Sequence, residues 1–166
     1  KNETKLGYFK VEIFKAYTPY YFDYKEKLLC IVSAMNLVKL LTVESQSNVN
    51  VFNLIGNLYS IFNIDDWVKE YIFWELKLLE IVGFNLQLNK IAKSEVINNE
   101  KKYFVGSNSQ KKYVPNFLID RDEKKLDKKT LSKALKLVGD FLEKNVLKPN
   151  NISYPNSRLE FANLFK

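Results

Sequence analysis

Five segments of the chain carry hydrophobic residues at steps of three and four, the spacing that places them on one face of an α-helix. They span residues 23–42, 49–62, 65–83, 130–147 and 156–165. Residues 49–62 leave little polar face, so we expect this helix to be central. The pattern as a whole predicts a mainly α fold in which the helices bury these faces against one another.

The element with the clearest boundaries is residues 65–83. Asp65 or Asp66 is expected to cap its N-terminus, where a carboxylate favours the positive end of the helix. Gly83 stands where a left-handed C-cap residue belongs. The apolar stripe of this helix contains Trp67, Tyr71, Trp74, Leu78 and Ile81. Aromatic side chains can form a base-stacking platform, but apolar neighbours at helical spacing favour the core, and we predict a core.

The first residues alternate between apolar and polar side chains, which is the period of a β-strand. Within residues 6–15, Phe9, Val11 and Ile13 share one face. A single strand is not stable alone, because its hydrogen-bonding edges need partners. We therefore interpret this segment as the last strand of a domain that lies mostly upstream.

Two shorter segments, residues 101–105 and 111–114, predict the arms of a β-hairpin around residues 106–110. Residues 120–129 form a run of mixed charge, which is typical of a solvated loop. Thr130 is expected to cap the helix that follows. The predicted fold is therefore a helical bundle domain with a small β-hairpin insertion and one N-terminal strand.

Composition excludes several classes of chemistry. The 166 residues contain no His, which excludes every catalytic triad that needs an imidazole. The single cysteine, Cys30, lies in a predicted apolar stripe, where a small buried hydrophobe is a commoner role than a reactive thiol. Asp65, Asp66, Glu75 and Glu80 are expected as helix caps and helix-surface residues. We predict no catalytic residue, no metal and no cofactor, although a magnesium site made of carboxylates alone stays an alternative.

The net charge of +7 invites an anionic partner. Of the 26 basic residues, only Arg121 and Arg158 are arginines, and asparagine is also abundant. Lysine and asparagine rise together in AT-rich genomes, so compositional drift is an alternative explanation of the charge. Lysine lacks the planar fork that reads a guanine edge, so we expect contacts to a nucleic-acid backbone rather than to bases.

Lysines gather in the predicted hairpin and in the charged run, and this clustering alone makes them candidate DNA-binding residues. They are Lys101, Lys102, Lys111, Lys112, Lys124, Lys125, Lys128 and Lys129. Lysines displace counterions from phosphates, so binding through them falls steeply with salt. An ordinary solvated surface is the alternative for each lysine taken singly.

Four stretches of the chain carry patterns that recur together in one family. Residues 71–84 contain the pattern aromatic-Glu-Leu-x-Leu-Leu-x-x-x-Gly-Phe, and residues 137–146 contain Gly-x-Phe-Leu-x-x-x-Val. With the strand of residues 6–14 and the hairpin of residues 101–114, they resemble the RecO recombination mediator family in order and spacing. Residues 6–14 look like the closing strand of its N-terminal OB domain, and residues 101–114 look like a hairpin of its alphaproteobacterial members.

The resemblance implies that residues 1–17 are the terminal strand of a truncated OB domain and that residues 18–166 are the helical domain. It implies a non-enzymatic protein that binds single-stranded DNA, anneals complementary strands and works with RecR to load RecA onto DNA coated by single-strand binding protein. The expected partners are single-stranded DNA, RecR and the acidic, apolar-ended C-terminal tail of single-strand binding protein. That tail needs a hydrophobic cleft rimmed by lysine or arginine. A cytoplasmic, nucleoid-associated bacterial protein with no membrane contact is expected.

The chain departs from the family pattern in two ways. Many RecO proteins carry two Cys-x-x-Cys pairs that hold structural zinc, whereas residues 85–129 contain no Cys or His, so zinc is not expected here. The resemblance also implies that most of the OB domain, a principal DNA surface in the family, is not part of this sequence. Two other functions stay open: a helical protein-interaction domain whose basic charge is compositional, and a metal-dependent nuclease that uses carboxylates.

Overall fold

The computed structural model describes residues 10–13, 15–106, 111–121 and 126–166. Within them the chain is mainly helical with one small antiparallel sheet, which confirms the predicted fold class. The long helices are α1 (Lys25–Leu41), α2 (Val49–Ile61), α3 (Trp67–Ile81), α6 (Lys128–Leu142) and α7 (Asn156–Asn163). The short elements are the 3-10 turn η1 (Thr18–Tyr21), α4 (Leu88–Ile91), α5 (Phe117–Asp120), the π-helical turn η2 (Glu143–Leu147) and the 3-10 turn η3 (Lys148–Asn150). The strands are β1 (Lys93–Ile97), β2 (Glu100–Val105) and β3 (Lys112–Val114).

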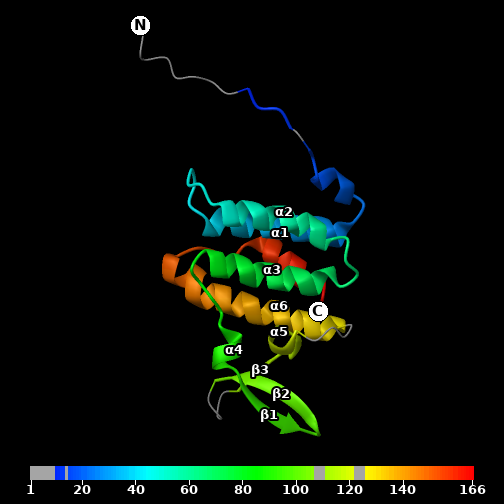
Figure 1. Ribbon diagram of the computed structural model, residues 1–166, viewed down its shortest axis with the longest axis vertical. Helices are drawn as coiled ribbons and strands as arrows, with labels where there is room; N and C mark the ends of the chain where they lie inside the picture. The colour runs from blue at the N-terminus through cyan, green and yellow to red at the C-terminus, as the bar shows by residue number, and fades with distance from the viewer. Residues whose placement is uncertain (1–9, 14, 107–110, 122–125) are drawn as a thin grey trace.

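The long helices are stacked in layers at one end of the molecule, and the sheet lies at the other end (Figure 1). Helix α3 packs against α2 on one side and α6 on the other, while α7 packs mainly against α1. Helix α5 and the short α4 lie between the helical layers and the sheet (Figure 1). The centre of the bundle is therefore α3, which contacts α1, α2 and α6 through its backbone neighbours and α7 through side chains such as Glu75 with Arg158.

The aromatic stripe of α3 lies in the core, as the helical spacing predicts. Tyr71 and Trp74 are buried, and their rings stack with centroids 5.8 Å apart. The Trp74 indole N–H donates to the backbone oxygen of Leu54, 2.6 Å away, so its polar atom is satisfied inside the core. The C-terminal end of α3 is also as predicted, because Gly83 has a φ of 94° and Phe84 N donates back to Leu79 O.

Helix α2 is not the central helix that its composition predicts. Only Val51, Leu54 and Leu58 of this helix are buried. Phe52 lies on the opposite face and is 76% exposed. Apolar residues around a whole helix permit burial on every side, but α2 has a large contact with α3 on one side only.

Several helix starts differ from their predicted caps. Helix α6 begins at Lys128 because the Asp127 side chain, not Thr130, is the cap and accepts from the Thr130 N–H at 3.0 Å. The predicted loop of residues 120–129 is correspondingly shorter. The Asp66 side chain makes no capping hydrogen bond to α3. Helix α1, for which no cap is predicted above, starts after Tyr24 without a side-chain cap. Tertiary packing therefore fixes these helices more than their caps do.

The predicted hairpin is part of a three-stranded sheet in the order β1-β2-β3. Strand β1 pairs antiparallel with β2, with Val96 opposite Lys101 and Ile97 opposite Glu100. The two residues between these strands, Asn98 and Asn99, both have positive φ, at 52° and 61°. That backbone matches the two-residue turns that suit the twist of a hairpin. The prediction of a β-insertion is right, but it missed this strand.

The predicted N-terminal strand is not found in the described part of its range. Residues 10–13 and 15–17 adopt no regular structure, and Val11 and Ile13 are 85% and 84% exposed. Residues 6–9 and 14 lie outside the described residues. The sheet of the described residues contains only β1, β2 and β3, so it provides no partner for this segment.

Candidate nucleic-acid interface

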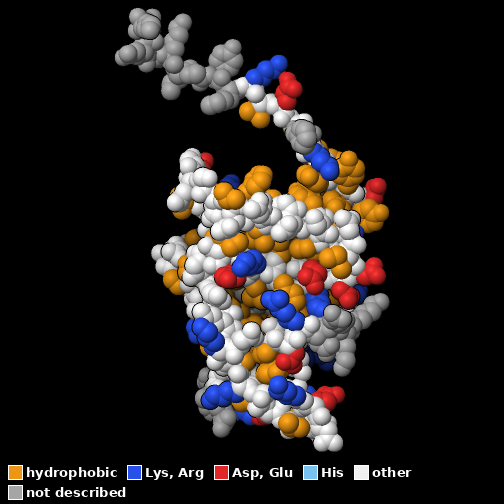
Figure 2. All heavy atoms as spheres, viewed as in Figure 1, with side chains coloured by type: hydrophobic (Ala, Val, Ile, Leu, Met, Phe, Trp, Pro, Cys, Tyr) orange, Lys and Arg blue, Asp and Glu red, His pale blue; other side chains and the backbone are white. Residues whose placement is uncertain are grey.

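A groove of about 920 Å³ lies between the sheet and the start of α6, and we call it the hairpin groove. Lys101 and Lys102 of β2 line one side, and Lys133 of α6 lines the other. Its remaining walls include Tyr113, Val114, Pro115, Asn116, Phe117 and Leu126, with Glu100 and Asp127 at its edges. Figure 2 shows basic side chains gathered at this end of the molecule, with acidic ones among them. The groove thus combines cationic side chains with apolar and aromatic surface.

Hydrogen bonds hold the walls of the hairpin groove together. The Asn116 side-chain amide donates to the backbone oxygen of Lys101 at 2.6 Å. The Tyr103 hydroxyl donates to Asp120 at 2.6 Å, so both bonds tie β2 to the segment around α5. The Lys101 ammonium lies 4.7 Å from the centre of the Tyr103 ring. Its interaction with the Tyr103 hydroxyl, and then the charge of Asp120, raise the pKa of Lys101.

Lys111 and Lys112 lie beside the groove and are already engaged with carboxylates. Lys111 forms an ion pair with Glu95 of β1, and the Tyr113 hydroxyl donates to the same carboxylate at 2.9 Å. These two hydrogen bonds lower the pKa of Glu95. Lys112 lies 3.5 Å from Asp140 of α6, so it links the sheet to the bundle. A phosphate group would have to compete with these carboxylates for both lysines.

Lys128 and Lys129 lie exposed in the first turn of α6, next to Asp127 at the edge of the groove. Hydrogen bonds from the Thr130 side chain and then its backbone N–H lower the pKa of Asp127. Of the predicted lysines, the structure therefore places Lys101 and Lys102 in the groove, and Lys128 and Lys129 next to Asp127, which lines it. It adds Lys133, which the clustering argument missed. Lys124 and Lys125 lie outside the described residues.

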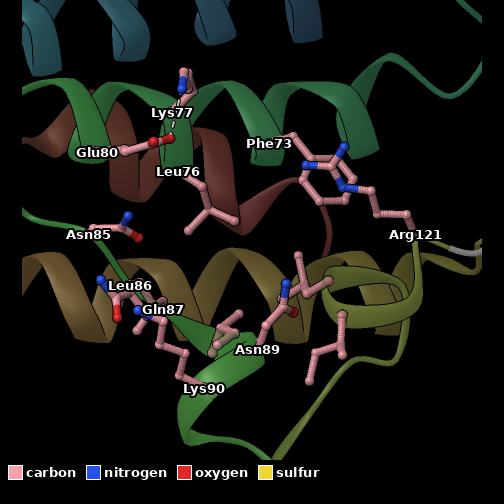
Figure 3. A pocket seen from close by; sticks show the side chains of 13 residues that line it. Phe73, Leu76, Lys77, Glu80, Asn85, Leu86, Gln87, Asn89, Lys90 and Arg121 are labelled. Atoms are coloured by element: carbon pink, nitrogen blue, oxygen red, sulfur yellow. Dashed lines mark hydrogen bonds and ion pairs between the residues drawn. The ribbon is translucent and has the colours of Figure 1, made fainter.

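A second groove of about 530 Å³ runs between α3, residues 85–90 and α5, and we call it the α3–α5 groove (Figure 3). Its apolar residues are Phe73, Leu76, Leu86, Leu88, Leu118 and Ile119. Lys77, Lys90 and Arg121 are its basic residues, and Lys77 pairs with Glu80 at 2.8 Å. The Arg121 guanidinium lies over the Phe73 ring, 5.7 Å from its centre (Figure 3). Apolar surface edged by cations suits an acidic ligand with an apolar end.

The buried charges of the molecule form a separate network inside the bundle. Arg158 of α7 is 1% exposed and binds Glu75 of α3 through two hydrogen bonds of 2.5 and 2.9 Å. Arg158 also donates to Leu135 O of α6 at 2.9 Å, and the Tyr71 hydroxyl donates to Glu75 at 2.9 Å. The prediction that Glu75 lies on the helix surface is wrong, because Arg158 provides a partner that allows burial.

Burial and the charge of Glu75 raise the pKa of two groups beside this network. Burial, and then the Glu75 carboxylate, raise the pKa of Tyr71 and of the Cys30 thiol well above their ordinary values. Cys30 is thus a buried, protonated thiol, which agrees with the predicted role of a small core residue. The network has its polar groups satisfied by protein partners, and it connects α3, α6 and α7.

The described residues provide neither a carboxylate metal cluster nor a membrane-spanning helix. No three His, Cys, Asp or Glu side chains of that part of the chain come together as ligands for a metal ion. None of its helices combines the length and the apolar character needed to cross a lipid bilayer. Asp65, the residue on which a nuclease hypothesis depends, is exposed at the turn between α2 and α3.

Comparison with known proteins places most of the chain in one family. Residues 25–153 match the family model described as recombination protein O C terminal. The DNA repair protein RecO of Rickettsia canadensis (strain McKiel) is 34% identical over 104 residues, which cover 63% of this chain and 42% of the relative. Those of Rickettsia africae (strain ESF-5) and Rickettsia akari (strain Hartford) are 29% and 27% identical, covering 78% and 95% of this chain.

The chain spans only part of these relatives: 60% of the Rickettsia africae protein and 70% of the Rickettsia akari protein. No solved structure matches the chain. The family match nevertheless covers α1 to η3 and the whole sheet, including both grooves and the Glu75 side of the buried network. On this evidence the chain belongs to the RecO family.

Proposed function

We propose that this protein acts in DNA repair as a recombination mediator and that it binds single-stranded DNA along the hairpin groove. The observation that carries this proposal is the convergence of Lys101 and Lys102 with Lys133 and the start of α6 on one groove. The family membership and the names of the relatives, DNA repair protein RecO, support the biological role. In this proposal residues 18–166 are the helical domain, and residues 1–17 belong to the OB domain.

The proposed binding is electrostatic. Each lysine that neutralises a phosphate releases counterions from the strand, and this release favours binding at low salt. The net charge of +7 extends the attraction over the whole molecule. Two DNA strands held by such a surface repel one another less, so complementary strands can anneal. No step of this mechanism needs a bond to be made or broken, and we propose a non-enzymatic protein.

We further propose that the α3–α5 groove receives the acidic, apolar-ended tail of single-strand binding protein. Phe73 and Leu76 provide apolar surface for the end of the tail, and Lys90 and Arg121 provide charges for its carboxylates. Arg121 lies against the Phe73 ring, so the charged and apolar contacts are adjacent (Figure 3). Together with RecR, a mediator held in this way on coated DNA would load RecA at the bacterial nucleoid.

The test of the DNA-binding proposal is a salt titration of the affinity for a single-stranded oligonucleotide. The double variant Lys101→Glu/Lys102→Glu should weaken binding at least about tenfold. It should also make the fall of log affinity with log salt shallower, by about 1.4 in the slope. The matched control, Lys39→Glu/Lys144→Glu, changes the net charge equally at exposed sites on α1 and η2. It should leave the slope unchanged.

Three results would contradict the proposal. Equal losses in the two double variants would show that only the net charge matters and that the groove is no site. Indifference to DNA combined with tight binding of an acidic tail peptide would favour a protein-interaction domain whose charge is compositional. Magnesium-dependent cleavage that is lost in Asp65→Ala would instead support the nuclease hypothesis.

A further inference from the structure

Aromatic side chains are concentrated around η1, at the opposite end of the molecule from the sheet (Figure 1). Five of the eight residues from 17 to 24 are aromatic: Tyr17, Tyr20, Tyr21, Phe22 and Tyr24. We call these five residues, with Tyr59 of α2, the η1 aromatic cluster. Tyr20, Phe22 and Tyr24 are 69%, 63% and 57% exposed, whereas the aromatic residues of α3 lie in or against the core. Hydrophobic side chains also gather at the surface in this region (Figure 2).

The inner rings of the cluster are held in place by the bundle. Tyr17 stacks on Tyr59 with ring centres 4.7 Å apart, and Tyr21 packs edge-on against Phe62 at 4.9 Å. Pro19 lies in the first turn of η1, where its ring restricts the backbone. The exposed rings are thus mounted on an ordered turn, so a ligand that stacks on them loses little conformational entropy of the protein.

Two lysines lie over these rings. The Lys15 ammonium is 4.6 Å from the centre of the Tyr17 ring. The Lys27 ammonium is 5.2 Å from the centre of the Tyr24 ring and donates to the backbone oxygen of Phe62 at 2.8 Å. This hydrogen bond fixes one cation beside the aromatic surface.

A shallow depression of about 280 Å³ separates η1 from α2. It is lined by Lys15, Tyr17, Tyr20, Tyr59 and Asn63, among others. Aromatic faces beside lysines are the combination with which proteins bind unpaired bases without sequence preference. A buried core does not need these exposed rings, and a purely electrostatic surface does not need aromatic ones.

We propose that the η1 aromatic cluster is a stacking site for the unpaired bases of single-stranded DNA, distinct from the hairpin groove. The proposal depends on the proposed function, because it takes single-stranded DNA as the ligand. It differs in chemistry, since the cluster recognises bases and the hairpin groove recognises phosphates. The two sites therefore respond to different changes in the DNA.

The test compares an oligothymidylate with an abasic oligonucleotide of the same length, using fluorescence anisotropy on the whole chain. Substituting Tyr20, Phe22 and Tyr24 together by Ala should weaken binding of the oligothymidylate at least about tenfold, because each stacked base contributes about 1–3 kcal/mol. Binding of the abasic oligonucleotide should not change. The control is Phe52→Ala, which removes an aromatic ring of similar exposure from α2 and should affect neither ligand.

Each other outcome overturns the stacking site. Equal losses for both oligonucleotides would show an electrostatic or folding effect, and no loss would show that bases do not contact these rings. A lower melting temperature without a change in base preference would assign the rings to packing against another protein segment. The triple Leu variant keeps the apolar volume and should reproduce the loss measured for the triple Ala variant if π-stacking is responsible.

The same measurements separate this proposal from the proposed function. Lys101→Glu/Lys102→Glu should weaken both oligonucleotides, because both carry phosphates. If only that variant has an effect, the hairpin groove stands and the stacking site fails. If only the aromatic variant has an effect, the hairpin groove fails and the stacking site stands.

Discussion

Opposite charges meet in two different settings in this molecule. Inside the bundle, Glu75 and Arg158 are almost completely buried and share two hydrogen bonds. At the sheet, Lys112 and Asp140 pair at 3.5 Å with most of the lysine side chain in water. Both pairs join parts of the chain that are far apart in sequence, but water surrounds only one of them.

The difference determines what each charge can do. Removing one partner from a buried pair leaves a charge without solvent, so Glu75 and Arg158 depend on each other and are unavailable to a ligand. An exposed pair contributes little to stability, because water and salt compensate its loss. The lysines at the sheet end are thus free to exchange a carboxylate for a phosphate at small cost. The buried pair therefore has a structural role, whereas the exposed pair at the sheet leaves its lysine available to a ligand.

The largest effect is expected from breaking the buried pair. Arg158→Ala should lower the free energy of unfolding by about 3–5 kcal/mol, because Glu75 stays buried without its partner. Urea denaturation followed by circular dichroism measures the change. The control is Arg121→Ala, which removes the other arginine from an exposed position and should change stability by less than about 0.5 kcal/mol.

A double variant tests whether the charge itself causes this loss. Replacing Glu75 and Arg158 together by Met removes both charges and keeps apolar volume, so it should be more stable than Arg158→Ala. The recovery should be partial, because Tyr71 and Leu135 O lose hydrogen-bond partners. A double variant as unstable as the single one would show that packing, not charge, is responsible.

A smaller effect is expected where α6 and the segment before α7 approach each other. A Cβ atom at Gly139 would lie 2.6 Å from the Tyr154 hydroxyl oxygen, closer than such atoms can approach. Gly139→Ala should therefore destabilise the bundle by about 1 kcal/mol, the cost of overpacking less the better helix propensity of Ala. Thermal unfolding measures the shift.

Removal of the clashing oxygen is the matched test. In Gly139→Ala/Tyr154→Phe the nearest remaining atom of that ring is 3.7 Å away, an ordinary contact. If the clash is the cause, Gly139→Ala should cost stability in the natural chain but not in a chain that already carries Tyr154→Phe. If the two costs are equal, the clash is relieved in another way and the contact between these residues is looser than the structure shows.

The sequence predicts the bundle well and the sheet end less well, and the physical reason differs between them. Helix α3 was expected at residues 65–83 and spans Trp67–Ile81, because apolar spacing reports the face that packs. Strand β1 shows no clear alternation and is held by its pairing with β2 and by the turn at Asn98 and Asn99. Helices α4 and α5, of four residues each, are too short to show a period.

The candidate sites, too, are predictable only where the residues that form them are close together in the sequence. Clustering in sequence predicts Lys101 and Lys102, but Lys133 joins them only because α6 lines the same groove as β2. Glu75 was expected at the surface, although it lies four residues after Tyr71 on the apolar stripe. A carboxylate at that position is a usable signal for a buried partner. The sequence does not show which residue that partner is, because Arg158 is 83 residues further along the chain.

The smallest expected effect concerns the carboxylate at the sheet. Hydrogen bonds from Lys111 and Tyr113 hold the pKa of Glu95 below its ordinary value. A folded-state pKa below the unfolded one means that the ionised form stabilises the fold at neutral pH. This contribution is present above the ordinary pKa of a glutamate and is lost as the pH falls through the lower folded-state value. Glu95→Gln should thus be slightly less stable than the natural chain at pH 7, and the difference should vanish in acid.

Unfolding curves in urea between neutral and acidic pH measure this difference. Lys111→Met removes a donor to the same carboxylate, so it should reproduce part of the pH dependence of Glu95→Gln. A difference between Glu95→Gln and the natural chain that stayed constant with pH would show that the ion pair does not act through ionisation. A difference as large as that of Arg158→Ala would remove the contrast between the two regions, because the sheet end would then depend on its charges as the bundle does.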